Sequence, residues 1–173
     1  MRRLIFIVLV VMVSVGTAMA NEKEIQVNLV NDQGLGENIG TISVQDSKYG
    51  LILTPKLSNL PQGIHGFHIH QNPDCSNMMT GGKPMAASAA GGHFDPLMTG
   101  KHEGPYGNGH SGDLPFLYVD KDGKALLPVL APRLKVSDLK GRSLMIHAGG
   151  DNYSDVPEKL GGGGSRLACG AVK

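Results

Sequence analysis

The sequence predicts an all-β domain, an eight-stranded antiparallel barrel or sandwich with two long functional loops. Three observations support this prediction. Short apolar or alternating segments recur between turn signals. Beyond residue 20, no window keeps a helical apolar rhythm for more than about two turns. Glycine is abundant, at 25 residues, whereas tryptophan is absent, as expected of a chain rich in strands and loops.

The first twenty residues precede this fold and read as an export signal. Arg2 and Arg3 are followed by an unbroken apolar run over residues 4–13, and Ala18-Met19-Ala20 is a small-x-small cleavage motif. Such a segment is a secretory signal peptide, too short for a permanent membrane span. We therefore expect residues 1–20 to be removed and residues 21–173 to form one exported domain without a membrane anchor.

Charge and cysteine content narrow the class of protein. Loss of Arg2 and Arg3 takes Lys plus Arg from 16 to 14 against 15 Asp plus Glu, so the net charge moves from +1 to −1. A near-neutral chain without a basic run argues against nucleic acid as a partner. The two cysteines, Cys75 and Cys169, are expected to form a disulfide in an exported protein, and two buried free thiols are the alternative.

Eight segments bounded by turn residues give the strand count. Residues 25–29 alternate cleanly between apolar and polar side chains, and residues 39–44 do so less strictly. The other segments are 49–53, 63–70, 114–119, 125–130, 143–147 and 166–172. The stretch 120–123 ends in Asp-Gly and predicts a hairpin turn, because this pair tolerates the positive φ that such turns need. A brief helical turn is expected within 132–140, with Ser137 as its cap.

Two segments interrupt the strand rhythm. Residues 71–113 contain no convincing strand, and residues 149–165 form a polar, glycine-rich stretch. Loops of this length in a compact domain are usually functional or disordered. Together they contain three of the seven histidines as well as Asp113 and Asp151. Disorder would not require these residues, so the sequence favours function.

Three histidines fall in the predicted strand 63–70. Side chains alternate between the two faces of a strand, so His68 and His70 share one face while His65 lies on the other. Two imidazoles on one face lie roughly 6 to 7 Å apart along the strand, and both can reach one metal ion. His65 is expected to have a structural, hydrogen-bonding role.

The loop histidines complete two sets of metal donors. One set combines three imidazoles with a carboxylate, which suits a tetrahedral zinc ion; its members are His93, His102, His110 and Asp113. A solvated loop that is rich in histidine is the alternative. His147 ends an apolar strand, and with His68, His70 and one shared histidine it provides four nitrogen donors. An all-imidazole set of this kind suits a redox-active copper ion.

These residues resemble the copper-zinc superoxide dismutases, in their bacterial exported form, over essentially the whole mature chain. The resemblance rests on the His147-x-x-x-Asp151 spacing and on the segments GFHIH, GGHFDP, KHEGP, GHSGDLP and GSRLACG. It implies an eight-stranded Greek-key barrel or sandwich and a periplasmic location. It also implies dismutation of superoxide to oxygen and hydrogen peroxide by copper that cycles between Cu(II) and Cu(I).

The resemblance further implies one copper and one zinc ion per subunit and a role for each site residue. Copper is held by His68, His70, His93 and His147, and zinc by His93, His102, His110 and Asp113. His93 then bridges the two ions and supplies a proton during catalysis. Arg166 attracts and orients the superoxide anion, and Asp151 links His68 to His102 behind the metal ligands. Monomer and homodimer both stay open.

A non-catalytic copper- or zinc-binding domain, or a copper-delivery domain, on the same fold is the alternative function. It predicts the loss of a copper ligand or of Arg166, and neither is lost. The sequence assigns no role to Met78, Met79 and Met85. Thioether sulfur favours Cu(I), but packing of the loop is the interpretation that the sequence favours.

Overall fold

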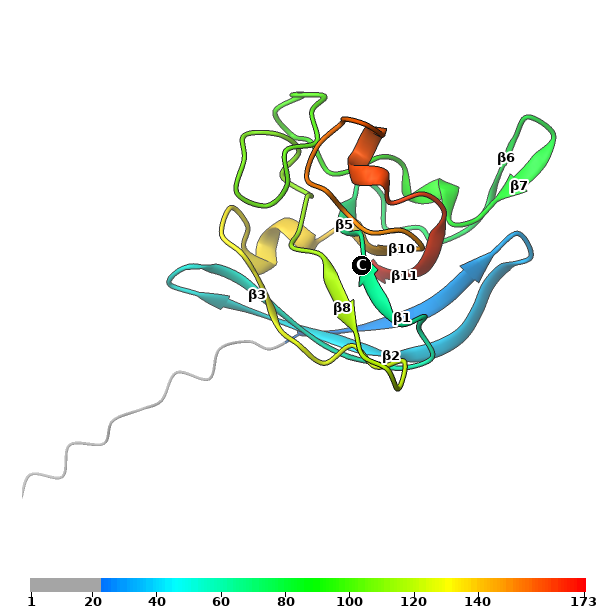
Figure 1. Ribbon diagram of the computed structural model, residues 1–173, viewed down its shortest axis with the longest axis horizontal. Coiled ribbons are helices and arrows are strands. Elements are labelled where there is room, and N and C mark those ends of the chain that lie inside the picture. Colours follow the sequence, from blue (N-terminus) through cyan, green and yellow to red (C-terminus); the bar gives the residue numbers. More distant parts are fainter. Residues whose placement is uncertain (1–22) are drawn as a thin grey trace, which may run out of the picture.

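The computed structural model describes residues 23–173 and is built almost entirely of strands and loops (Figure 1). The predicted signal peptide lies outside the described residues. Within them, no helix is long and apolar enough to cross a membrane. The helical segments are three short 3-10 turns, at Ser88–Ala90 (η1), Val136–Leu139 (η2) and Lys159–Gly162 (η3).

Seven strands form one curled antiparallel sheet in the order β5-β10-β11-β1-β2-β3-β9 (Figure 1). Their bounds are Lys23–Asn31 (β1), Gly34–Ser47 (β2), Gly50–Leu57 (β3), Phe67–His70 (β5), Val129–Ala131 (β9), Arg142–His147 (β10) and Arg166–Val172 (β11). The first and last strands, β1 and β11, are neighbours, and β5 pairs with β10 although some seventy residues separate them. The predicted all-β class is confirmed.

Two small sheets complete the fold. Gly63–His65 (β4) pairs with Leu117–Val119 (β8), and Met78–Thr80 (β6) pairs with Lys83–Met85 (β7). The second pair is a hairpin that projects from the body of the molecule (Figure 1). The sequence placed no strand in residues 71–113, so the hairpin is a difference from the prediction.

Alternation along the strands separates the hydrophobic core from the side that bears the histidines. In β5, Phe67 and Ile69 belong to the core cluster, and in β10 Leu144 and Ile146 do the same. The residues between them on the same strands point the other way, and these include both histidines of β5. The buried core thus forms a rigid wall behind the imidazoles.

Three predicted strands are divided or shortened in the structure. The single strand expected over residues 63–70 is wrong, because it is two strands, β4 and β5, which pair with different partners. Residues 114–119 become strand only at β8, because Pro115 has no N–H to donate. Residues 125–130 become strand only at β9, which follows Pro128. A turn is present at 120–123, with Gly123 at φ +74°. The predicted hairpin is wrong, because the flanking strands pair elsewhere, β8 with β4 and β9 with β3.

The helical turn expected within 132–140 is present as η2, but its predicted cap is wrong. The turn begins after Lys135, whose backbone N–H donates to Asp138 Oδ2 at 2.8 Å. Ser137 lies inside the turn. An aspartate three residues into the turn reaches back to the capping residue and satisfies a donor that Ser137 cannot reach.

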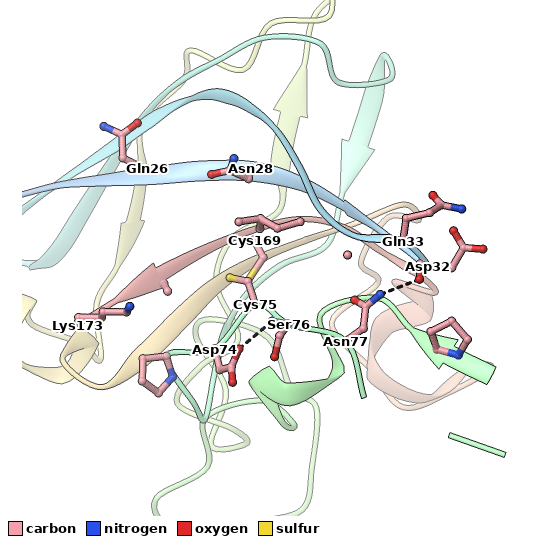
Figure 2. Close-up of a pocket in the computed structure, with 15 residues that line it drawn as sticks. Gln26, Asn28, Asp32, Gln33, Asp74, Cys75, Ser76, Asn77, Cys169 and Lys173 are labelled. Carbon is pink, nitrogen blue, oxygen red and sulfur yellow. Dashed lines mark hydrogen bonds between the residues drawn. A yellow bond between two sulfur atoms is a disulfide. The ribbon is translucent and has the colours of Figure 1, made fainter. Parts of the chain in front are cut away.

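The disulfide Cys75–Cys169 is confirmed. It ties β11 to residues 71–113, which we call the long loop. Beside the disulfide lies a cavity of about 660 Å³, lined by residues of β1, of the turn into β2, of β11 and of the long loop (Figure 2). None of the predicted metal ligands lines this cavity. It is therefore separate from the histidine cluster.

The methionines of the long loop do not pack as expected. Met78, Met79 and Met85 lie on the β6–β7 hairpin and are 57%, 69% and 47% exposed. Met78 and Met85 are cross-strand partners. This exposure does not support the loop packing that the sequence favours for these three residues.

Candidate metal centre

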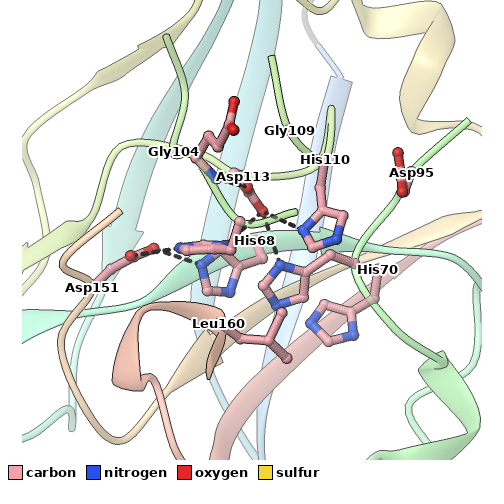
Figure 3. Close-up of polar contacts among 12 residues, drawn as sticks. His68, His70, Asp95, Gly104, Gly109, His110, Asp113, Asp151 and Leu160 are labelled. Atoms are coloured by element: carbon pink, nitrogen blue, oxygen red, sulfur yellow. Dashed lines mark hydrogen bonds and ion pairs between the residues drawn. The ribbon is translucent and has the colours of Figure 1, made fainter. Parts of the chain in front are cut away.

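All the predicted metal ligands are buried, and they converge on one region of the molecule. Figure 3 labels four of them, His68, His70, His110 and Asp113. Two groups have donor atoms that all lie within 4.8 Å of one another. They are His68, His70, His93 and His147 in the first group, and His68, His93, His102 and Asp113 in the second. The first group equals the predicted copper set. The second differs from the predicted zinc set by one residue, having His68 in place of His110.

Four buried nitrogen atoms in the first group find no hydrogen-bond partner among residues 23–173. They are His68 Nδ1, His70 Nε2, His93 Nε2 and His147 Nε2. Buried polar atoms in folded proteins are nearly always paired, so four orphans in one place require an explanation. A metal ion bound to all four would satisfy them.

The second ring nitrogen of each of these histidines is held by another group. His68 Nε2 donates to Asp151 Oδ2 at 2.8 Å, and His70 Nδ1 donates to the Gly91 carbonyl at 2.9 Å. His147 Nδ1 lies 3.2 Å from the Gly164 carbonyl. A neutral imidazole that donates from one nitrogen keeps a lone pair on the other. The hydrogen bonds therefore select the tautomers that a metal requires.

The predicted zinc donors surround one carboxylate oxygen. The Nδ1 atoms of His93, His102 and His110 lie 2.9, 3.1 and 3.3 Å from Asp113 Oδ1. His102 Nδ1 and His110 Nδ1 have no hydrogen-bond partner among the described residues in spite of this approach. Ligand atoms of a tetrahedral zinc ion, at about 2.0–2.1 Å from the metal, lie roughly 3.3 Å apart. The donor set fits such an ion, and it includes His110.

Asp151 connects the two donor sets from behind (Figure 3). Its Oδ2 accepts from His68 Nε2, and its Oδ1 accepts from His102 Nε2 at 2.7 Å. The backbone beside it must lack a side chain, because a Cβ at Gly161 would lie 2.1 Å from Asp151 Oδ1. The sequence pointed to Asp151 but gave no reason to single out Gly161 within its run of four glycines.

Burial sets the charge states of the imidazoles. It lowers the pKa of His68 to about 3 and that of His147 to about 4, and the neighbouring charge of His93 adds to both shifts. Burial also lowers the pKa of His70 and of His93. These four imidazoles are neutral near pH 7, which is the form that binds a metal ion.

The pKa values of Asp113, Asp151 and His102 shift in the direction opposite to the effect of burial. Burial alone would raise the pKa of Asp113 and of Asp151, but hydrogen bonds from the histidines outweigh it and hold both pKa values below the ordinary one. Burial disfavours charge on His102 as well, yet the two carboxylates raise its pKa to about 9. Without a metal, a proton on His102 balances part of this negative charge.

Arg166 stands at the edge of the imidazole cluster. It pairs with His147 at the end of the β10–β11 ladder, just after a β-bulge between Ile146 and His147. Its guanidinium donates to the Ala87 carbonyl and, at 2.6 Å, to the Gly91 carbonyl. Gly91 also accepts from His70. One backbone carbonyl therefore fixes the position of Arg166 relative to His70, a connection that the sequence did not reveal.

His65 is separate from the donor groups, as expected, although it lies on β4 and not on the strand of His68 and His70. It is buried, and its Nδ1 and Nε2 lie 2.8 Å from the carbonyl oxygens of His147 and Pro61. Its contact with the main chain of His147 confirms a structural, hydrogen-bonding role.

Fold and site together define a β-barrel metalloprotein with two adjacent, imidazole-rich sites. The family model for copper/zinc superoxide dismutase (SODC) matches residues 38–172. The Cu-Zn superoxide dismutase 2 of Salmonella typhimurium is 52% identical over 100% of both chains. The Cu/Zn superoxide dismutase from Brucella abortus has a TM-score of 0.86 and 45% identity, covering 88% of this chain and 100% of that one.

A monomeric copper, zinc superoxide dismutase from Salmonella enterica is similar too, with a TM-score of 0.80 and 54% identity over 88% of this chain and 99% of that one. The chain belongs to the copper/zinc superoxide dismutase family. It is an enzyme that converts superoxide to oxygen and hydrogen peroxide, with one copper and one zinc ion as cofactors. The non-catalytic alternative is not favoured.

Proposed function

We propose that the two ions divide the donor atoms between them, with His93 shared. Copper takes the four orphaned nitrogens of His68, His70, His93 and His147. Zinc takes Nδ1 of His93, His102 and His110 and one oxygen of Asp113. The observation that carries this proposal is the placement of the two nitrogens of His93: Nε2 belongs to the first group, and Nδ1 lies 2.9 Å from Asp113 Oδ1.

His93 is proposed to hold a proton at Nε2 when this nitrogen is not bound to copper, and to release it during the reaction. Copper, when bound, supplies the one-electron exchange between Cu(II) and Cu(I) that carries an electron from one superoxide to the next. The overall reaction consumes two superoxide anions and two protons and yields one oxygen and one hydrogen peroxide. A nitrogen that is buried beside the reacting centre and faces no other acceptor can deliver one of these protons.

Arg166 is proposed to bind the anion. A guanidinium stays charged and offers several N–H donors in a rigid plane, which suits a small diatomic anion. Its bonds to the Ala87 and Gly91 carbonyls hold it still and leave further N–H groups to donate. Burial lowers the pKa of Arg166, but the group remains a cation at neutral pH.

Asp151 is proposed to orient His68 and His102 for their respective ions. A carboxylate that accepts from the far nitrogen of a ligating imidazole fixes its tautomer and makes it a better ligand. Since one carboxylate serves one histidine of each set, loss of Asp151 is expected to weaken both sites.

The enzyme is proposed to act in the periplasm as a monomer. The predicted signal peptide over residues 1–20 and the bacterial relatives support export. Mass spectrometry of the exported protein tests this, and we expect the mass of a chain that begins at Asn21. The relative from Salmonella enterica is described as monomeric, which supports a monomer rather than the homodimer left open by the sequence. Light scattering of the purified enzyme decides between these states.

Substitution of one ligand from each set tests the division of donors. In His147→Ala, we expect copper content to fall, zinc content to persist and superoxide decay to return to the rate without enzyme. In the matched variant His110→Ala, we expect zinc content to fall and copper content to persist. Metal content by mass spectrometry and decay of superoxide by pulse radiolysis provide the measurements. Full activity of copper- and zinc-treated His147→Ala would contradict the proposal.

A further inference from the structure

Arg133 is a partly buried arginine outside both donor sets, and it lies against the loop that carries His110. It follows β9, which is fixed to β3 in the main sheet. Its guanidinium donates four hydrogen bonds to backbone carbonyls of residues 104–110. These are Nε to Pro105 at 3.1 Å, Nη1 to Gly109 at 3.0 Å, and Nη2 to Gly104 at 3.0 Å and to His110 at 2.6 Å.

The 104–110 loop has little other support for its main chain. Apart from those to Arg133, hydrogen bonds among the described residues hold its main chain at only two positions. The Asn108 N–H donates to Glu103 Oε2, and His110 donates to Lys101 and accepts from Asp113. Pro105 has no N–H, and three of the seven residues are glycine. A chain of this composition loses much conformational freedom when it becomes ordered. The four carbonyls that point at one guanidinium offset part of that cost.

The loop carries a proposed zinc ligand at its end. The shortest of the four bonds, at 2.6 Å, reaches the carbonyl of His110, while the side chain of the same residue places Nδ1 3.3 Å from Asp113 Oδ1. Figure 3 shows His110 beside Asp113. The position of the His110 ring therefore depends on a main chain that Arg133 holds.

We infer that Arg133 is a positioning residue for the zinc site. It holds the 104–110 loop, before an ion binds, in the conformation that presents His110. This inference rests on the proposed assignment of His110 to zinc. A guanidinium is needed because its five N–H donors form a planar fork that meets several carbonyls at once. A lysine ammonium keeps the charge but not this geometry.

Zinc affinity of the mature, full-length protein tests the inference. We expect Arg133→Lys to lower the affinity for zinc, measured by competition with a chromogenic chelator, by about 10- to 100-fold, as is usual for groups that support a metal ligand. Arg142→Lys is the matched control, because Arg142 also donates to backbone carbonyls, of Asp138 and Gln71, but to none in the 104–110 loop. We expect the control to keep its zinc affinity.

Two further readouts separate the outcomes. The visible spectrum of the Co(II)-substituted protein should change in Arg133→Lys, because a misplaced His110 alters the ligand field. If Arg133→Lys binds zinc as tightly as the unchanged protein while His110→Ala does not, the inference about Arg133 is wrong and the zinc assignment stands. If His110→Ala keeps full zinc affinity, the zinc assignment itself is wrong.

Hydrogen exchange of the unchanged, zinc-free protein tests the inference without a variant. Because Arg133 is proposed to order the loop before the ion arrives, the amide of His110, which donates to Lys101 at 2.9 Å, should be protected. Exchange of this amide at the rate of an unstructured peptide would overturn the inference even if the arginine variants failed to fold.

Discussion

Gly161 lies against the carboxylate that joins the two donor sets, with φ at +72°. A Cβ at this position would come within 2.1 Å of Asp151 Oδ1 and 2.8 Å of His102 Nε2. Those two atoms are themselves 2.7 Å apart and hydrogen-bonded. Any side chain at residue 161 would have to part them or move the loop.

A pair of alanine substitutions isolates this contact. Gly161 and Gly162 both have positive φ, at +72° and +76°, but a Cβ at Gly162 would meet nothing nearer than Glu158 Oε2 at 3.6 Å. Both variants suffer backbone strain, whereas only Gly161→Ala displaces Asp151. We expect Gly161→Ala to lose about 10- to 100-fold in zinc affinity and Gly162→Ala to lose little. Equal affinities in a chelator competition would contradict this account.

Single residues could be predicted where strand periodicity applies, and less well elsewhere. The structure agrees that His68 and His70 share one face and that His65 lies apart. It does not agree that one strand carries all three, because His65 lies on β4 and the other two on β5. Nothing in a run of four glycines indicates which of them meets a side chain ten residues earlier. The same holds for Arg133, because its four partners lie 23 to 29 residues away in the chain.

At the scale of elements, the site depends on how the long loop is fixed to β11. The disulfide joins Cys75 to Cys169, and Arg166 on the same strand donates to the carbonyls of Ala87 and Gly91 in the loop. Gly91 in turn accepts from His70 of β5. The loop is therefore attached to two strands close to the proposed copper ligands.

Removal of the disulfide should lower stability and loosen Arg166 together. For a loop closed by residues 94 apart, the chain-entropy model gives a loss of about 4 to 5 kcal/mol. We expect the double variant Cys75→Ser/Cys169→Ser to show this loss in the free energy of unfolding of the metal-free protein, measured with denaturant. We also expect weaker inhibition by small anions, since Arg166 would be less well fixed. An unchanged unfolding free energy would contradict the first expectation.

Elements with their own pattern were predictable, and elements that depend on partners were not. The alternation of residues 25–29 and the apolar segment 143–147 both correspond to strands, β1 and β10. In contrast, β8 and β9 are three residues each, because their lengths depend on prolines and on distant partners in β4 and β3. The β6–β7 hairpin has no buried face, so no apolar pattern signals it.

At the scale of the whole molecule, the stability of the metal-free protein depends on histidines whose pKa values are shifted in opposite directions. His68, His70, His93 and His147 have lowered pKa values because they are buried, whereas the carboxylates around His102 raise its pKa to about 9. In the unfolded chain all of them titrate near the ordinary value of about 6.5. Stability must therefore depend on pH in opposite directions on the two sides of that value.

The metal-free protein should be most stable near pH 6.5. Below this pH the unfolded chain binds more protons than the folded one, because the four buried imidazoles resist protonation, so stability falls as the pH drops toward 4. Above it, the stability that protonated His102 contributes is lost as the pH rises through about 9. Denaturant unfolding of chelator-treated protein at several pH values measures this curve. A stability that rises steadily from pH 6.5 down to pH 4.5 would contradict the charge states described above.

One imidazole, that of His93, is proposed to serve both ions. Electron paramagnetic resonance of the protein with Cu(II) in both sites can detect this, because a shared imidazolate couples two unpaired electrons. We expect a spectrum from coupled Cu(II) pairs, replaced by uncoupled signals in His93→Ala. Two independent Cu(II) signals in the unchanged protein, with both sites filled, would contradict it.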